Sequence, residues 1–138
     1  MKKIILMVGM ITSLASFSTA QNKDYKVVFD LTSKDTLNQQ SLLHEMSLIK
    51  EGNPDANIEA VIYGQGLGLI RKDASTQSAE IQKLLSMKDV SIKVCALAMK
   101  RQKVDESQLL PGVQIVPDGI YEIISKQRDG WGYIKVAH

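Results

Sequence analysis

Cysteine and histidine are both scarce in this chain of 138 residues. The sequence contains one cysteine, Cys95, and two histidines, His44 and His138. A single cysteine cannot form a disulfide within its own chain, and no C-x-x-C motif is present. The two histidines are far apart in sequence, so no cluster of metal-ligating residues is visible. We therefore expect a fold that is stable without a disulfide and a function without a metal or a cofactor.

The chain also lacks an excess of charge of one sign. It has 17 Lys and Arg residues against 15 Asp and Glu residues, and two of the lysines, Lys2 and Lys3, stand at its start. Without these two lysines the opposite charges balance, and they are scattered along the sequence. This distribution gives no electrostatic support for binding to nucleic acid or to an anionic membrane surface.

No apolar run is long enough for a transmembrane helix, but the first twenty residues have the layout of a secretory signal peptide. A basic start at residues 1–3 precedes a mostly apolar run over 4–14, and the small residues Ser18 and Ala20 stand before Gln21. We predict a signal peptide over 1–20 and one domain over 21–138. The protein would then be exported, to the periplasm, without a membrane span in its mature form.

Strand patterns alternate with helical patterns along this domain. Runs rich in β-branched and aromatic residues predict strands over 25–31, 58–63, 90–95, 113–116 and 131–136. Helices are expected between them, over 36–51 with an N-cap from the polar turn Thr32 to Asp35, 76–88 with Ser75 as the cap, 96–101, and 117–129 with Gly130 as a left-handed cap. In the last helix Ile120, Ile123 and Ile124 are expected to form the buried face. The alternation predicts an α/β fold, a three-layer α/β/α sandwich around a mainly parallel five-stranded sheet.

The first predicted helix has a second stripe that is only partly polar. Leu37, Ser41, His44 and Leu48 form it, on nearly the opposite side from the residues that face the core. We interpret this stripe as a subunit contact and assign His44 to it. A hydrolase that pairs Cys95 with a histidine base is disfavoured, because the nucleophile and its base must lie within hydrogen-bond reach.

Cys95 lies where the third strand passes directly into a helix. Ligands of open α/β sheets bind beyond the carboxyl ends of the strands, and a helix N-terminus favours the thiolate form of a cysteine. Lys100 and Arg101 follow within about a turn and a half and add positive charge. Strand alternation places Cys95 on the more polar face, with Lys93. The alternative interpretation is a small buried core residue, since free cysteines are among the most buried residues.

A glycine-rich segment, Gly64-Gln65-Gly66-Leu67-Gly68, follows the second strand. Glycines at the carboxyl end of a strand let the backbone turn sharply and approach a ligand closely. The spacing matches neither the dinucleotide-binding fingerprint nor a P-loop. The segment is therefore either a flexible turn or a wall of the same crevice as Cys95, formed by Gly64, Gln65, Gly66 and Gly68.

Several motifs resemble the DsrE/DsrF-like family, and more closely its exported, single-domain bacterial branch. They are Val94-Cys95-Ala96-Leu97-Ala98-Met99, Leu109-Leu110-Pro111-Gly112-Val113, Val116-Pro117-Asp118-Gly119-Ile120 and the segment 127–134, within a similarity that covers residues 25–138. The resemblance implies a three-layer α/β/α domain that assembles into trimers or hexamers. In cytoplasmic members of the family a cysteine carries sulfur as a persulfide, and Cys95 is the residue that matches it.

Two functions follow from these observations. In the first, the Cys95 thiolate attacks a sulfane sulfur donor, holds the sulfur as a persulfide and passes it to an acceptor thiol of another molecule. The thiolate would be stabilised by Lys100 and Arg101. In the second, the protein is a non-enzymatic module that binds a small ligand or assembles into oligomers. Cys95 is then structural, and the glycine segment forms the binding site.

Overall fold

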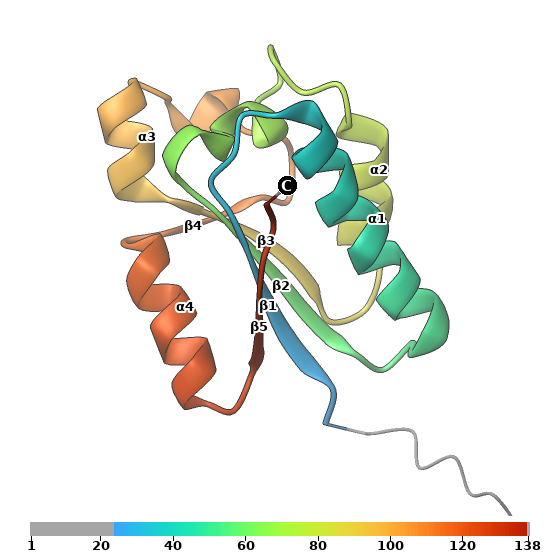
Figure 1. The fold of residues 1–138 in the computed structure, drawn as a ribbon. Helices are drawn as coiled ribbons and strands as arrows, with labels where there is room; N and C mark the ends of the chain where they lie inside the picture. The colour runs from blue at the N-terminus through green and yellow to red at the C-terminus, as the bar shows by residue number, and fades with distance from the viewer. Residues whose placement is uncertain (1–23, 138) are drawn as a thin grey trace, which may run out of the picture.

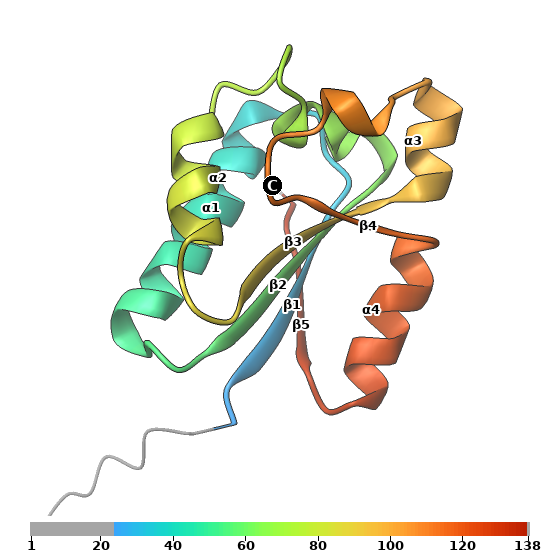
Figure 2. The same ribbon diagram turned by 180° about the vertical axis from the view of Figure 1, so that it is seen from behind.

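The computed structural model describes residues 24–137 and contains a five-stranded sheet with helices on both faces (Figures 1 and 2). The strands are β1 (Lys26–Leu31), β2 (Asn57–Ile62), β3 (Val90–Cys95), β4 (Gln114–Val116) and β5 (Gly132–Lys135). The helices are α1 (Thr36–Gly52), α2 (Ser78–Leu85), α3 (Ala96–Gln102) and α4 (Gly119–Arg128), with short 3₁₀ helices η1 (Gly64–Ile70) and η2 (Glu106–Gln108). All paired strands are parallel, in the order β4-β3-β2-β1-β5, which confirms the predicted three-layer α/β/α fold. The predicted signal peptide lies outside the described residues.

One face of the sheet is covered by α1 and α2 and carries most of the apolar core (Figure 1). Alternate strand residues point to this side, and the two helices place apolar residues against them. The largest side chains that are fully buried here are Phe29, Leu31, Leu42, Leu43, Met46, Ile58, Ile62, Leu67, Leu69, Ile70, Ile81 and Leu84. This layer holds the sheet in register, so the carboxyl ends of the strands form a fixed edge.

The opposite face of the sheet is covered by α4 and is much more polar. Its apolar cluster contains only Val28, Val61 and Ile123, with a few half-buried neighbours. The prediction that Ile120 and Ile124 face the core is wrong, since they are 55% and 48% exposed. The reason is that this face of the sheet carries charged side chains. The helix therefore turns its own charged residues toward the sheet and two isoleucines toward solvent.

The ends of α4 are set by local hydrogen bonds. Gly130 has a φ of +84°, and its N–H donates to the carbonyl oxygen of Gln127 at 3.1 Å, which confirms the predicted left-handed cap. At the other end Asp118 is the N-cap, and its Oδ1 accepts from the N–H of Ile120 at 2.9 Å. The helix therefore begins after Asp118 and not at Pro117, which the sequence had suggested as part of the first turn.

The other two predicted caps differ in outcome. Asp35 closes the start of α1, because its Oδ1 accepts from the N–H of Leu37 at 2.8 Å. The prediction that Ser75 caps the second helix is wrong. Helix α2 begins at Ser78, and Ser75 Oγ instead accepts from the N–H of Gln77 at 3.2 Å. This bond closes the turn that precedes the helix.

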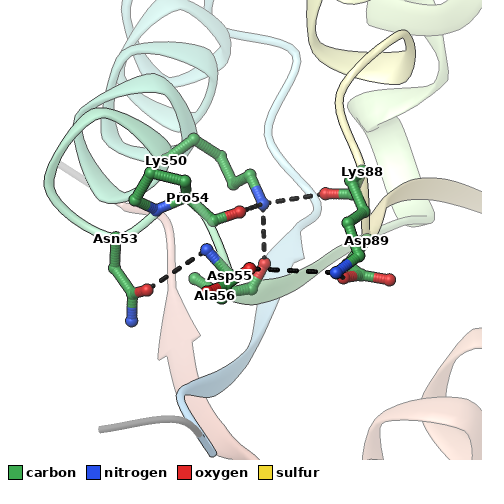
Figure 3. Close-up of polar contacts among 7 residues, drawn as sticks. All are labelled: Lys50, Asn53, Pro54, Asp55, Ala56, Lys88 and Asp89. Atoms are coloured by element: carbon green, nitrogen blue, oxygen red, sulfur yellow. Dashed lines mark hydrogen bonds and ion pairs between the residues drawn. The ribbon is translucent and has the colours of Figure 1, made fainter. Parts of the chain in front are cut away.

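A buried lysine joins three backbone segments at the amino-terminal edge of the sheet (Figure 3). Lys50, near the end of α1, is 7% exposed. Its Nζ donates to the carbonyl oxygens of Pro54 at 2.5 Å, Ala56 at 3.0 Å and Lys88 at 2.8 Å. These carbonyls precede β2 and β3, so the ammonium group fixes where both strands begin. The site lies at the edge of the sheet opposite to Cys95.

Candidate functional site

A cleft of about 720 Å³ lies at the carboxyl ends of β2 and β3. Cys95, the last residue of β3, is part of its lining, and so are Gly64, Gln65 and Arg101. The structure thus brings four of the predicted site residues together from three different segments. The Cys95 side chain lies deep in the site, because the residue is only 5% exposed. Both interpretations of Cys95 therefore hold in part: it is buried, and it borders an open cleft.

The start of α4 is packed directly against Cys95. A Cβ atom added to Gly119 would lie 3.1 Å from Cys95 Cβ and 3.1 Å from Val61 Cγ1. These distances are shorter than ordinary carbon–carbon contacts, so a side chain at this position would require Cys95 and Val61 to move slightly away. Gly119 follows Asp118, which also lines the cleft. The cysteine is therefore enclosed between the beginning of α3 and the beginning of α4.

Tyr63 forms another wall of the cleft and is held in place by a buried carboxylate. Its hydroxyl donates to Asp30 Oδ2 at 3.2 Å, and the Tyr133 hydroxyl donates to the same oxygen at 2.6 Å. Burial, together with the nearby Asp30 carboxylate, raises the pKa of Tyr63 to about 12. The phenol therefore stays protonated at neutral pH, and Tyr63 serves as a neutral, fixed wall and not as a base.

The two cations predicted to stabilise a thiolate are placed differently. Both residues are exposed, but only Arg101 belongs to the lining of the cleft. Among the residues that the structure describes, none forms a hydrogen bond or an ion pair with the Arg101 side chain. Its neighbour Gln102 instead donates through Nε2 to the carbonyl oxygen of Gly64, which ties α3 to η1. Arg101 is thus the one cation among the described lining residues, and no side chain within 24–137 pairs with it.

The glycine segment forms a 3₁₀ helix, η1, and only its first two residues reach the cleft. Gly64 has a φ of +56°, which favours glycine. Gly66 is buried, and an added Cβ would lie 3.0 Å from the carbonyl oxygen of Leu31. Gly68 has no atom within 4 Å of such a Cβ. The structure therefore places Gly66 and Gly68 outside the lining, with Gly66 in a packing role.

Sequence reasoning missed six residues of the lining. They are Tyr63, Leu97, Ala98, Gln102, Asp118 and Ile120. Two of them could have been predicted from their positions, since Tyr63 directly follows β2 and Asp118 lies two residues beyond β4. The rule that selected Cys95, that ligands bind beyond the carboxyl ends of parallel strands, applies equally to these positions.

His44 lies away from this cleft. It is exposed on α1 and borders a shallow depression with Asp35, Leu37, Gln40 and Ser41. Helix α1 covers the other face of the sheet from α4, so His44 does not share a site with Cys95. The arrangement agrees with the surface role predicted for His44 and gives no support to a cysteine–histidine hydrolase.

A network of charges attaches α4 to the sheet beneath the cleft. Glu59, which is 1% exposed, accepts from Lys93 at 2.9 Å and from Lys126 at 3.1 Å. Lys93 also contacts Glu122 Oε1 at 2.7 Å. Burial alone would raise the pKa of Glu122, but its bonds to the lysines, first of all Lys93, hold that pKa below the ordinary 4.5. Likewise, burial alone would lower the pKa of Lys93, but its bonds to Glu122 and Glu59 raise it above 10.5.

The depressed pKa of Glu122 predicts a stability contribution that acid removes. The contribution is complete above the unfolded-state pKa of 4.5 and is lost as the pH falls through the lower folded-state value. Glu122→Gln should therefore lower the free energy of unfolding by about 1–2 kcal/mol at neutral pH, and this deficit should shrink in acid. Urea titrations between about pH 7 and pH 3 would measure the deficit at neutral pH and its decrease in acid. Glu45→Gln, an exposed position on α1, is the control, and a pH-independent deficit at Glu122 would contradict the assignment.

Within residues 24–137, no helix combines the length and the apolar character that are needed to cross a membrane. Those same residues contain no group of three or more His, Cys, Asp or Glu side chains placed to hold a metal ion. The groups that line the cleft are a thiol, a guanidinium group, a carboxylate, a phenol, amides and apolar side chains.

The fold and the cleft define a small α/β/α protein with a thiol at the carboxyl edge of a parallel sheet. Residues 26–136 match the model of the DsrE/DsrF-like family, and the chain belongs to this family. Among solved structures, protein MTH1491 of Methanobacterium thermoautotrophicum, described as of unknown function, is similar with a TM-score of 0.76 and 28% identity. That similarity covers 81% of this chain and 99% of MTH1491.

Two further solved structures share the fold. The ychN protein from E. coli has a TM-score of 0.66 at 12% identity, over 80% of this chain and 98% of that protein. BT1422 of Bacteroides thetaiotaomicron, of unknown function, has a TM-score of 0.67 at 18% identity, over 80% and 94% of the two chains. No curated protein sequence matches the chain.

Proposed function

We propose that this protein carries sulfane sulfur on Cys95 as a persulfide and passes it to an acceptor thiol. The observation that carries the proposal is the position of the chain's one cysteine, in the lining of a cleft that also holds the guanidinium group of Arg101, which pairs with none of residues 24–137. Membership of the DsrE/DsrF-like family, which is associated with sulfur relay, supports it. The identities of the donor and the acceptor are not needed for the chemistry.

The transfer requires only one thiol from this protein. The Cys95 thiolate attacks the outer sulfur of a persulfide donor R–S–SH, a new S–S bond forms, and the donor's S–S bond breaks. The donor leaves as R–S⁻, and its proton stays on the transferred sulfur, so no external oxidant or reductant is consumed. Attack by an acceptor thiolate on the outer sulfur of Cys95–S–SH reverses these roles and regenerates the Cys95 thiolate.

Intact-mass spectrometry of the folded protein tests the proposal directly. Incubation with a low-molecular-mass persulfide should add one sulfur atom per chain, and an added dithiol should remove it. A maleimide should label Cys95 in the native protein, because the thiol borders an open cleft. Labelling that occurs only after denaturation, with no gain of sulfur mass, would refute the proposal.

One observation favours a second candidate function. Cys95 is nearly buried and is packed against Gly119, as a structural cysteine would be. The cleft would then bind a small ligand without covalent chemistry, or serve assembly. In that case Cys95→Ala would keep ligand binding, whereas Gly66→Val would disturb it, because a side chain at Gly66 meets the carbonyl oxygen of Leu31.

We also propose that the protein is exported to the periplasm and forms a homo-oligomer, a trimer or a hexamer, as in the exported single-domain branch that its sequence resembles. An exposed apolar stripe on α4, formed by Ile120, Tyr121 and Ile124, supports the oligomer. The layout of residues 1–20 supports export. A monomeric mass by light scattering would contradict the oligomer, and a mature chain that keeps Met1 would contradict export.

A further inference from the structure

We propose that the cleft receives an organic persulfide that bears a carboxylate, and that Arg101 binds this carboxylate while Cys95 takes the sulfur. The inference rests on the proposed sulfur-carrier function and adds the class of donor. It makes Arg101 a specificity-determining residue. Three features of the cleft carry the inference: its size, the chemistry of its walls, and the unused hydrogen-bonding capacity of its one guanidinium group.

The size of the cleft suits an organic molecule better than an inorganic sulfur anion. A volume of about 720 Å³ lies within the range of roughly 300–1,000 Å³ that is usual for small-molecule sites. Thiosulfate, with only five heavy atoms, would leave most of this space to water. The apolar side chains Leu97 and Ile120 belong to the lining and are exposed. These apolar side chains can pack against the carbon atoms of an organic ligand, but they offer no hydrogen bond to a small dianion.

Arg101 is the group in the lining that can select the donor by charge. Its guanidinium has five N–H donors, and none of the residues that the structure describes accepts from them. A planar guanidinium binds a carboxylate through two parallel hydrogen bonds, which are about twice as strong as neutral ones. The carboxylate of Asp118 also lines the cleft, but Asp118 Oδ1 already accepts from the N–H groups at the start of α4.

The geometry of the site orders these groups. Cys95 is at the end of β3, and Arg101 lies between one and two turns further along α3, which begins immediately after the cysteine. Because both residues line the same cleft, a ligand held by its carboxylate at Arg101 would lie within the space that the thiol borders. In low-molecular-mass thiols of the cysteine type, a short carbon chain separates the carboxylate from the sulfur. Such a donor can place its outer sulfur at Cys95 while its carboxylate stays at Arg101.

Matched donors and matched variants test the inference. The rate of sulfur loading onto Cys95 would be followed by intact mass with N-acetylcysteine persulfide, with the persulfide of N-acetylcysteine amide, and with thiosulfate. Arg101→Gln should slow loading from the carboxylate donor about tenfold and change loading from the amide less than twofold. Lys100→Gln is the control, because it removes the same charge one residue away, outside the lining. It should change each rate less than twofold.

The possible failures are distinguishable. If Arg101→Gln slows loading from the acid and the amide equally, Arg101 acts on the thiol and not on the donor. The inference is then overturned, and the sulfur-carrier function stands. If thiosulfate loads fastest and depends on Arg101, the donor is an inorganic anion and the inference is again overturned. If Lys100→Gln has the same effect as Arg101→Gln, long-range electrostatic attraction of the donor explains the selection, and the inference is overturned. If no donor loads Cys95, the proposed function fails, and the inference fails with it.

Discussion

Cys95→Ser should abolish the gain of sulfur mass completely, because the chain has no second thiol that could accept the sulfur. A serine hydroxyl is close to the thiol in size but stays protonated at neutral pH, so it is not a nucleophile toward sulfur. The cleft, its volume and its cationic group would remain. The variant thus removes the reacting atom and preserves its surroundings. Intact mass after incubation with N-acetylcysteine persulfide is the measurement.

The control for this experiment is a test of whether each variant is folded. Cys95 is nearly buried and touches the start of α4, so a hydroxyl there could destabilise the domain by about 1–3 kcal/mol. Thermal unfolding of Cys95→Ser and of Cys95→Ala, which buries no polar group, would show whether each variant is folded at the assay temperature. If either folded variant bound sulfur stoichiometrically and reversibly, this result would contradict the assignment of Cys95 as the carrier.

Lys50→Met should cause a large loss of stability while leaving the cleft untouched. Methionine fills a similar space but has no donors, so the carbonyl oxygens of Pro54, Ala56 and Lys88 lose a charged partner. Losing three such bonds in a mostly buried position should cost about 3–4 kcal/mol. In a domain of this size the melting temperature should fall by about 10–15 °C.

Lys88→Met is the matched control. The Lys88 side chain is exposed and contacts Asp55 at 3.8 Å and Asp89 at 3.6 Å. Surface pairs of this kind contribute about 0–1 kcal/mol, so the variant should melt within a few degrees of the wild type. Equal effects at Lys50 and Lys88 would show that the buried ammonium group does not secure the starts of β2 and β3. Sulfur loading per folded molecule should be unchanged in both variants.

Much of the fold could be predicted because its signals are local. The β-branched runs gave all five strands, and Asp35 and Gly130 marked helix ends correctly. The orientation of α4 could not be predicted in this way. Ile120, Ile123 and Ile124 have the spacing of a core-facing stripe, but only Ile123 is buried. What decides the orientation is Glu59, whose partners Lys93 and Lys126 are distant in sequence and meet it only in the assembled sheet.

The candidate site was predictable to a similar degree. The carboxyl-edge rule places Cys95, Gly64 and Gln65 correctly in one cleft. It could not separate Arg101 from Lys100, because adjacent helical residues point about 100° apart and the rotation of α3 depends on tertiary packing. Ile120 was missed for a related reason. Its assignment to the core came from a pattern that the charged face of the sheet overrides.

The attachment of α4 has one further consequence. The segment that carries Asp118, Gly119 and Ile120 to the thiol rests on ion pairs more than on apolar packing. These buried ion pairs weaken when acid protonates a carboxylate, whereas apolar contacts do not. The aperture in front of Cys95 should therefore depend on the medium around the protein, through charges that no substrate touches.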